Sequence, residues 1–203
     1  MRTKYQVALR SLWAVVLILL LSSCGSGSTF DQLVASRRSV RSYDATKTIT
    51  EDEVRTLIAT AQEAPSWANL QGTRYYVVMS AEKRAALAPV MGNNAQNIKD
   101  VPVVLVTTFV QRQSGFFNDE PSNELGDTWG AFDNGLSNAF LILKAKDMGF
   151  DTLIMGLRDA EGLRRILGIP SYETVTSVIA LGYGAGNPAR PTRKDLSEIV
   201  KFF

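Results

Sequence analysis

Apolar residues recur every three or four positions in five stretches of the chain, and this spacing predicts amphipathic α-helices. In the second stretch Thr50 and Glu53 form a capping-box pattern before the apolar stripe, and Pro65 ends it. The fourth stretch carries Phe132 and Phe140 on more than one face, so we expect a helix buried nearly all round. The predicted helices cover residues 29–37, 50–64, 81–90, 129–148 and 160–167.

Short runs rich in β-branched and aromatic residues alternate with these helices and predict β-strands. They cover residues 75–79, 103–106, 152–155 and 175–181. Residues 92–94 read as a turn, and the polar, glycine-containing residues 111–126 as a loop or lid. Strands interleaved with helices indicate one layered α/β or α+β domain.

The N-terminus has the pattern of an export signal. Arg2, Lys4 and Arg10 precede an apolar run over residues 12–21, which is too short to cross about 30 Å of hydrocarbon as a helix. We therefore interpret residues 1–23 as a signal peptide.

Cys24 follows that run directly, and Leu21-Ser22-Ser23-Cys24 resembles the lipobox of bacterial lipoproteins, whose Cys is lipidated. The alternative is an ordinary signal peptide with a chance Cys. Residues 24–29 would form a short flexible tether that keeps the domain, residues 30–203, close to a bilayer. Ser26 favours the outer membrane if the cell is Gram-negative. The expected location is thus the cell envelope.

The composition excludes several kinds of site. The 203 residues include no His and a single Cys, so imidazole-based triads, most zinc sites and thiolate metal clusters are excluded. No metal site is expected. The net charge of +2 gives no support for a nucleic-acid partner. Any chemistry must therefore rely on a bound cofactor.

Three arginines stand within five residues at 37, 38 and 41, beside Ser39. Guanidinium groups bind phosphate through paired hydrogen bonds, and an extended chain would direct alternate side chains to one side. The alternative is a solvated basic face at the end of the first helix.

Four segments, in this order, resemble the nitroreductase family. Ser36-Arg37-Arg38-Ser39-Val40-Arg41-Ser42-Tyr43 is similar to the family's opening signature R-R-S-x-R-x-[FY], and residues 64–71 are similar to its A-P-S-x-x-N-x-Q turn. Residues 154–157 occupy the place of the segment before its penultimate helix, and 181–183 match its L-G-Y ending. The resemblance implies an α+β three-layer fold with a central mixed, mostly antiparallel sheet, and a homodimer that binds FMN.

By this resemblance, one subunit holds the phosphate and the flavin edge. Arg37 and Ser39 would contact the phosphate and ribityl chain, with Arg38 beside them, and Arg193 would bind the phosphate from the C-terminal segment. Arg41 would lie near flavin N1 and O2, where a cation stabilises the negative charge of the reduced ring.

The backbone near flavin N5 and the partner subunit supply the rest of the implied site. Met155 and Gly156 would turn backbone N–H groups toward N5. Pro65, Ser66 and Asn69, with Gln71 as a weaker candidate, would reach the flavin from the partner subunit. Trp67, Phe116 and Phe117 could shape the substrate pocket, although aromatic residues more often serve packing.

Two positions depart from the family pattern. Met155 stands where several members carry Glu, and core packing is an equal reading for it. Pro191 stands where a phosphate-binding Lys is usual, and Arg190 could compensate. Gly182-Tyr183-Gly184-Ala185-Gly186 suggests a dinucleotide-binding turn, but no helix is expected after it, so we reject that reading.

The implied activity is an FMN-dependent ping-pong oxidoreductase that carries electrons to nitroaromatic or quinone-like acceptors. NAD(P)H is the family's expected donor, but an envelope location conflicts with a cytoplasmic donor, so an unknown envelope donor is possible. The alternatives are a non-catalytic flavin-binding lipoprotein and an interaction module on the same fold.

Overall fold

A computed structural model describes residues 29–203 of the chain, and four strands form its central sheet. The strand order is β1-β2-β6-β5, with all neighbours antiparallel. The strands are β1 (Thr73–Val78), β2 (Val103–Val110), β5 (Asp151–Met155) and β6 (Glu173–Gly182). The α+β class with an antiparallel sheet is confirmed, and the parallel element within it is an isolated bridge between Ser39 and Thr152. The predicted signal peptide, Cys24 and residues 25–28 lie outside the described residues.

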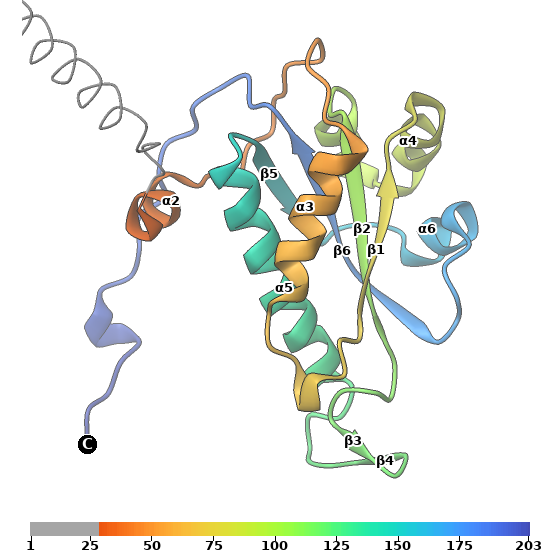
Figure 1. Cartoon of the computed structure of the whole chain (residues 1–203), viewed down its shortest axis with the longest axis vertical. Helices are drawn as coiled ribbons and strands as arrows, with labels where there is room; N and C mark the ends of the chain where they lie inside the picture. The colour runs from red at the N-terminus through yellow and green to blue at the C-terminus, as the bar shows by residue number, and fades with distance from the viewer. Residues whose placement is uncertain (1–28) are drawn as a thin grey trace, which may run out of the picture.

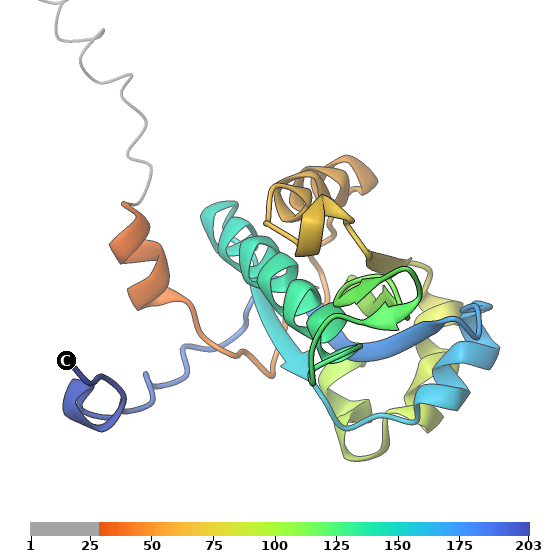
Figure 2. The same ribbon diagram turned by 90° about the horizontal axis from the view of Figure 1, so that it is seen from below.

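Helices cover both faces of this sheet, which gives three layers (Figures 1 and 2). Helices α3 (Glu51–Gln62) and α5 (Thr128–Asp147) lie on one face, and α4 (Ala81–Leu87) and α6 (Ala160–Leu167) lie on the other. In β2, Val103 and Leu105 pack in the core under α3 and α5. Val104 and Val106 pack in the core under α4 and α6. A strand buried on both faces reads as a continuous apolar run, as this one does.

Local capping explains where the helices begin. Thr50 accepts a hydrogen bond from the Glu53 N–H, and the Glu53 carboxylate accepts one from the Thr50 N–H, so the predicted capping box at the start of α3 is confirmed. At the other end of the fold, Gly168 ends α6 in the left-handed conformation, as its position after the apolar stripe predicts.

Helix α5 differs from its prediction. Its buried face is largely polar and includes Asp133, Asn134, Ser137 and Asn138, whereas Phe132 is 56% and Phe140 39% exposed. The expectation of a helix buried nearly all round is therefore wrong for a single chain. Asn134 pairs with the sheet beneath it: it accepts hydrogen bonds from the Thr107 and Thr176 hydroxyls and donates to the Thr108 carbonyl.

Two connections are more ordered than predicted. The helix expected over 81–90 ends at Leu87, and 3₁₀ turns follow at Ala88–Val90 and Gly92–Ile98, where a turn at 92–94 was expected. Within residues 111–126, β3 (Phe116–Phe117) and β4 (Glu120–Pro121) form a small hairpin. Its two turn residues, Asn118 and Asp119, have the positive φ angles that two-residue hairpins favour.

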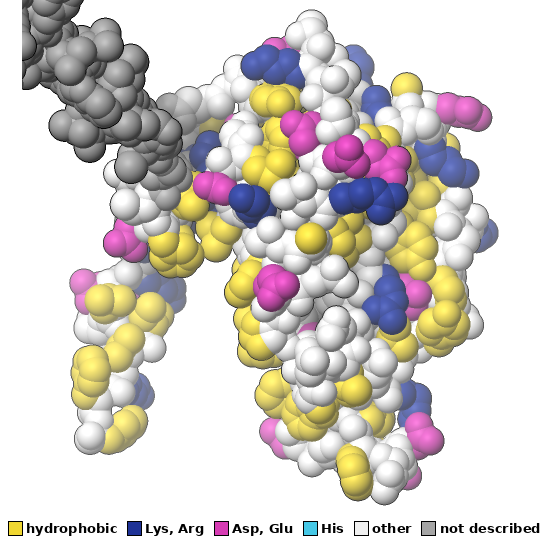
Figure 3. Space-filling model, viewed as in Figure 1, with side chains coloured by type: hydrophobic (Ala, Val, Ile, Leu, Met, Phe, Trp, Pro, Cys, Tyr) yellow, Lys and Arg dark blue, Asp and Glu magenta, His cyan; other side chains and the backbone are white. Residues whose placement is uncertain are grey.

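Two arms leave the body on the same side (Figures 1 and 2). The first is helix α2 (Phe30–Ser36), which buries none of its residues. The second is the C-terminal arm, residues 185–203, with a short 3₁₀ turn at Leu196–Glu198. Hydrophobic side chains lie exposed along both arms (Figure 3): Phe30, Val34, Leu196, Ile199, Val200, Phe202 and Phe203.

Among the described residues, none of the helices has the length and apolar character needed to span a membrane.

Candidate functional site

The arginine segment, residues 37–41, is extended and lies along the sheet edge. The Val40 N–H donates to the Thr152 carbonyl at 3.1 Å, and Ser39 pairs in parallel with Thr152. Because the Val40 side chain is buried in the core, its neighbours Ser39 and Arg41 face outward and are exposed. Ser39 and Arg41 therefore face away from the core together, as an extended segment predicts.

Arg38 is engaged differently from the other two arginines. Its Nη1 donates to the carbonyls of Ala35 at 2.6 Å and Arg37 at 2.9 Å, so the guanidinium satisfies the last turn of α2. Arg37 and Arg41 are the guanidinium groups of this segment that are left to bind an anion.

Tyr43 fixes the segment to the end of the sheet. Its hydroxyl donates to the Val40 carbonyl at 2.8 Å, and its backbone pairs with Gly184. Burial, followed by the nearby Asp151 carboxylate, raises the pKa of this phenol. Residues 182–186 thus end strand β6 and pair with the segment at Tyr43. No helix follows within residues 187–194, which agrees with rejecting a dinucleotide-binding turn.

Strand β5 leads from the arginine segment to an open stretch of backbone. Ser39 lies beside Thr152, and Gly156 follows four residues further along, roughly 13 Å by strand rise. Gly156 is exposed, and nothing lies within 4 Å of the place of a Cβ, so a flat ligand can approach its peptide groups closely. The Met155 side chain is buried in the core, which leaves its backbone to serve the site.

The turn over residues 65–71 is held in an uncommon conformation. Ala68, Asn69 and Gln71 all have positive φ, between 46° and 56°. Ser66 Oγ accepts from the Gln71 N–H at 3.0 Å, and Asn69 Oδ1 accepts from Gln71 Nε2 at 3.3 Å. Non-glycine residues with this backbone cluster at functional sites.

A cavity of about 550 Å³ opens beside this turn. It is lined by Pro65, Ser66, Gln71, Arg74, Tyr75 and Asp133, among others. Asp133 is 4% exposed, and its Oδ2 accepts from the Trp67 N–H at 3.0 Å and from Ser114 Oγ at 2.7 Å. One carboxylate thus ties the turn to residues 111–126. The sequence offered a signal for Asp133, an acidic residue within an apolar helix, that our prediction did not use.

An aromatic cluster covers the same region. The Trp67 and Trp129 ring centroids lie 4.9 Å apart, and Trp129 and Phe132 lie 5.5 Å apart. Phe116 and Phe117 belong to the β3–β4 hairpin, and Arg112 stacks on the Phe116 ring. Trp67 and the hairpin therefore border one end of the sheet.

One chain does not bring the predicted site residues together. The turn precedes Thr73, which pairs with Phe109, whereas the arginine segment lies at Asp151 and Gly182, at the far ends of β5 and β6. Strand β2 extends over eight residues between these two ends, so they are separated by roughly 20 Å. Arg193 lies on the exposed C-terminal arm and donates to the Pro191 carbonyl.

Comparison with known proteins gives one family. A model of the nitroreductase family matches residues 34–183. The Bacillus subtilis protein MhqN, named as a candidate NAD(P)H nitroreductase, is 26% identical over 202 residues, which cover 85% of this chain and 98% of MhqN.

Two solved structures have the same fold. A protein of Exiguobacterium sibiricum in complex with FMN superposes with a TM-score of 0.79 at 21% identity, covering 87% of this chain and 98% of that chain. The NADPH:FMN oxidoreductase of Vibrio harveyi, solved with NAD⁺, has a TM-score of 0.73 at 27% identity, covering 85% of this chain and 76% of that chain.

Proposed function

Because the chain belongs to the nitroreductase family, we propose that it binds FMN and passes electrons from a reduced donor to an organic acceptor. The observation that best supports this is the extended arginine segment, which bridges to Thr152 on β5 and exposes Arg41. Strand β5 then leads from this bridge to the open backbone at Gly156. A phosphate-bearing, flat cofactor needs both features.

The residues of the proposed FMN site have different roles. Arg37, Ser39 and Arg193 bind the phosphate, and the fixed charge of Arg41 favours the reduced ring. Bound FMN supplies hydride acceptance and release, so no side chain of this chain has to transfer a proton. The backbone at Met155 and Gly156 orients the ring. NAD(P)H is the expected donor, as the names of the relatives indicate for those proteins, unless an envelope donor replaces it.

The active form is a homodimer. The turn over residues 65–71 lies too far from the arginine segment to share a cofactor within one chain, but a two-fold partner can supply it. The apolar side of α5, with Phe132 and Phe140, and both arms present the hydrophobic surface that such a partner would cover. The aromatic cluster of Trp67, Trp129 and Phe132 then suits flat acceptors such as nitroaromatics or quinones.

The chain is anchored in the cell envelope through Cys24. This part of the proposal rests on the lipobox-like sequence. Cys24→Ser should move the protein from the membrane fraction to the soluble fraction and abolish labelling by a radioactive fatty acid. Unchanged membrane association would contradict lipidation at Cys24.

The absorption spectrum of the full chain, purified in detergent, tests the cofactor assignment. We expect flavin bands and a dimer on size-exclusion chromatography. Arg37→Ala should weaken FMN binding about 10- to 100-fold, the effect of one charge-assisted hydrogen bond. Arg165→Ala, on the exposed side of α6, is the matched control and should bind FMN normally. A colourless protein that ignores added FMN would refute the proposal.

Turnover separates an oxidoreductase from a protein that only holds flavin. The replacement of a usual Lys by Pro191 is the observation that keeps this second function under test. An enzyme should oxidise NADH or an artificial donor and reduce a quinone with parallel lines in a double-reciprocal plot. A flavin that is retained but stays oxidised with every donor would favour the non-catalytic alternative.

A further inference from the structure

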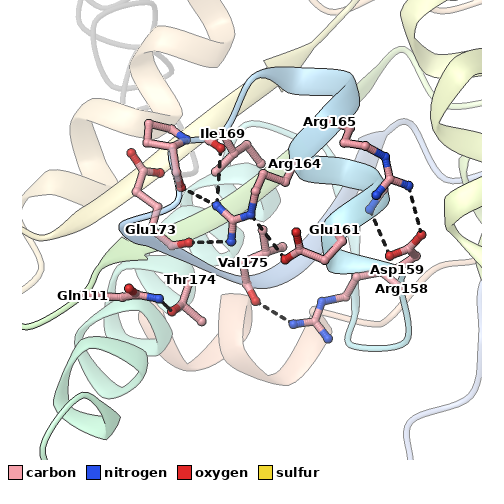
Figure 4. A network of polar contacts seen from close by, with 12 residues as sticks. Gln111, Arg158, Asp159, Glu161, Arg164, Arg165, Ile169, Glu173, Thr174 and Val175 are labelled. Carbon is pink, nitrogen blue, oxygen red and sulfur yellow. Dashed lines mark hydrogen bonds and ion pairs between the residues drawn. The ribbon is translucent and has the colours of Figure 1, made fainter.

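Arg158 holds the segment that leaves β5. Its Nη1 donates to the Gly156 carbonyl at 2.8 Å. Its Nη2 donates to the Val175 carbonyl at 2.6 Å, the bond drawn in Figure 4. Asn94 Nδ2 donates to the Leu157 carbonyl at 2.9 Å. The pairing of β5 with β6 ends at Met155, so the next two carbonyls have no strand partner and depend on these side chains.

The positive charge of Arg158 has no acidic partner among the described residues. The surrounding carboxylates are engaged elsewhere: Asp159 accepts from the Gly162 N–H and lies 4.0 Å from Arg165, and Glu161 pairs with Arg164. Arg158 Nε is buried without a hydrogen-bond partner in the described part of the chain. An unpaired, partly desolvated cation exerts a stronger field than a solvated one.

We propose that Arg158 is a positioning residue of the flavin site, which fixes the Gly156 peptide and, through its charge, favours the reduced over the oxidised cofactor. This inference rests on the proposed function, because Gly156 is the backbone assigned to the flavin ring. A neutral amide side chain would be enough to donate a hydrogen bond to the Gly156 carbonyl. A guanidinium adds a permanent positive charge near the proposed position of the ring. Arg158 thereby acts alongside Arg41 from a separate element.

Two substitutions separate the clamp from the charge. Arg158→Gln keeps an amide donor for the Gly156 carbonyl but removes the charge, and Arg158→Lys keeps the charge but loses the two-pronged geometry. Arg165→Gln removes a charge from the exposed side of α6, the helix that follows this segment, and is the matched control. The measurements on the FMN-loaded full chain are the midpoint potential of the bound flavin and the dissociation constant of oxidised FMN.

We expect Arg158→Gln to weaken the binding of reduced FMN about 10-fold relative to oxidised FMN, which lowers the two-electron potential by about 30 mV. Arg158→Lys should keep the wild-type potential but bind oxidised FMN several-fold more weakly. A Gln variant with the potential of wild type and of Arg165→Gln would overturn the role of the charge.

If Arg158→Gln does not fold, the Lys variant still tests whether the hydrogen bonds of Arg158 position the Gly156 peptide. Wild-type affinity for oxidised FMN in Arg158→Lys would overturn that role. The two proposals fail in different ways. A wild-type protein that binds no FMN refutes the proposed function, whereas a wild-type protein that binds FMN, with variants that leave its potential and affinity unchanged, refutes the role of Arg158 alone.

Discussion

At the scale of single residues, Gly130 sets how closely α5 approaches the sheet. A Cβ at this position would overlap the ring of Phe109 on β2, and both residues are buried. The absence of a side chain is therefore required for the helix to pack where Asp133 and Asn134, one turn further on, reach their partners.

Gly130→Ala should lower the free energy of unfolding by about 1–3 kcal/mol, the usual cost of overpacking a core. Urea unfolding followed by circular dichroism measures it. In a Phe109→Ala background, where the ring is gone, the same substitution should cost little. Equal costs in both backgrounds would show that the ring is not the constraint.

The raised pKa of Tyr75 predicts that the free energy of unfolding changes at alkaline pH. Burial raises its pKa from 10.0 to about 12, partly offset by its hydrogen bond with Ser137. Between about pH 10 and 12 the unfolded chain releases this proton while the folded chain keeps it, so stability falls as the pH rises, by up to about 1.4 kcal/mol per pH unit for one group.

The measurement is the urea midpoint across this pH range for wild type, Tyr75→Phe and Tyr172→Phe, an exposed control. Tyr75→Phe should be less stable at neutral pH, having lost a hydrogen bond, but should show a shallower decline in alkali. A decline as steep as that of wild type would exclude Tyr75 as a contributor.

At the scale of elements, α5 joins two segments that are far apart in sequence. Asp133 accepts from the Trp67 N–H in the turn and from Ser114 before the β3–β4 hairpin. Removing this carboxylate leaves two donors unpaired, one buried and one half-buried, whereas removing the Ser114 hydroxyl leaves the bond to Trp67 in place.

Asp133→Ala should speed amide hydrogen exchange in residues 65–71 and 111–116 together, and weaken FMN binding, whereas Ser114→Ala should affect mainly residues 111–116. We expect a destabilisation of about 1–3 kcal/mol for Asp133→Ala. Ser137→Ala, one turn along the same face, is the control for loss of a buried polar group. Unchanged exchange in residues 65–71 would refute the link.

The elements that sequence predicted correctly are those whose signals are local. The capping box of Thr50 and Glu53, the helix end at Gly168 and the apolar run of β2 are each determined by a few neighbouring residues. The inward polar face of α5 could not be predicted, because Asn134 is satisfied by Thr107 and Thr176, which only folding brings near. The arginine segment was visible as a motif, but the parts played by Asp133 and Arg158 depend on distant neighbours.

At the scale of the whole molecule, the proposed dimer makes Gly135 a test position. Gly135 is exposed on α5, and nothing lies within 4 Å of a Cβ placed there, so one chain tolerates a side chain. It lies three residues from Phe132, beside the apolar side of the helix.

Gly135→Leu should raise the dimer dissociation constant at least about 10-fold, because a branched side chain prevents close approach of a second helix, while the secondary structure stays intact. Sedimentation velocity over a dilution series measures this. Ala86→Leu, on the exposed side of α4 across the sheet, is the control. A dimer as tight as wild type in Gly135→Leu would move the interface away from α5.

The C-terminal arm would make a chain without its partner a target for peptidases. Residues 189–203 are all exposed, and they run largely outside regular structure, which is the form of backbone that peptidases bind. In the proposed dimer, the partner would cover this segment. If the chain pairs as proposed, a protease would trim single chains and spare assembled ones. The same cut would remove Arg193, the proposed phosphate ligand, together with part of the surface proposed for pairing.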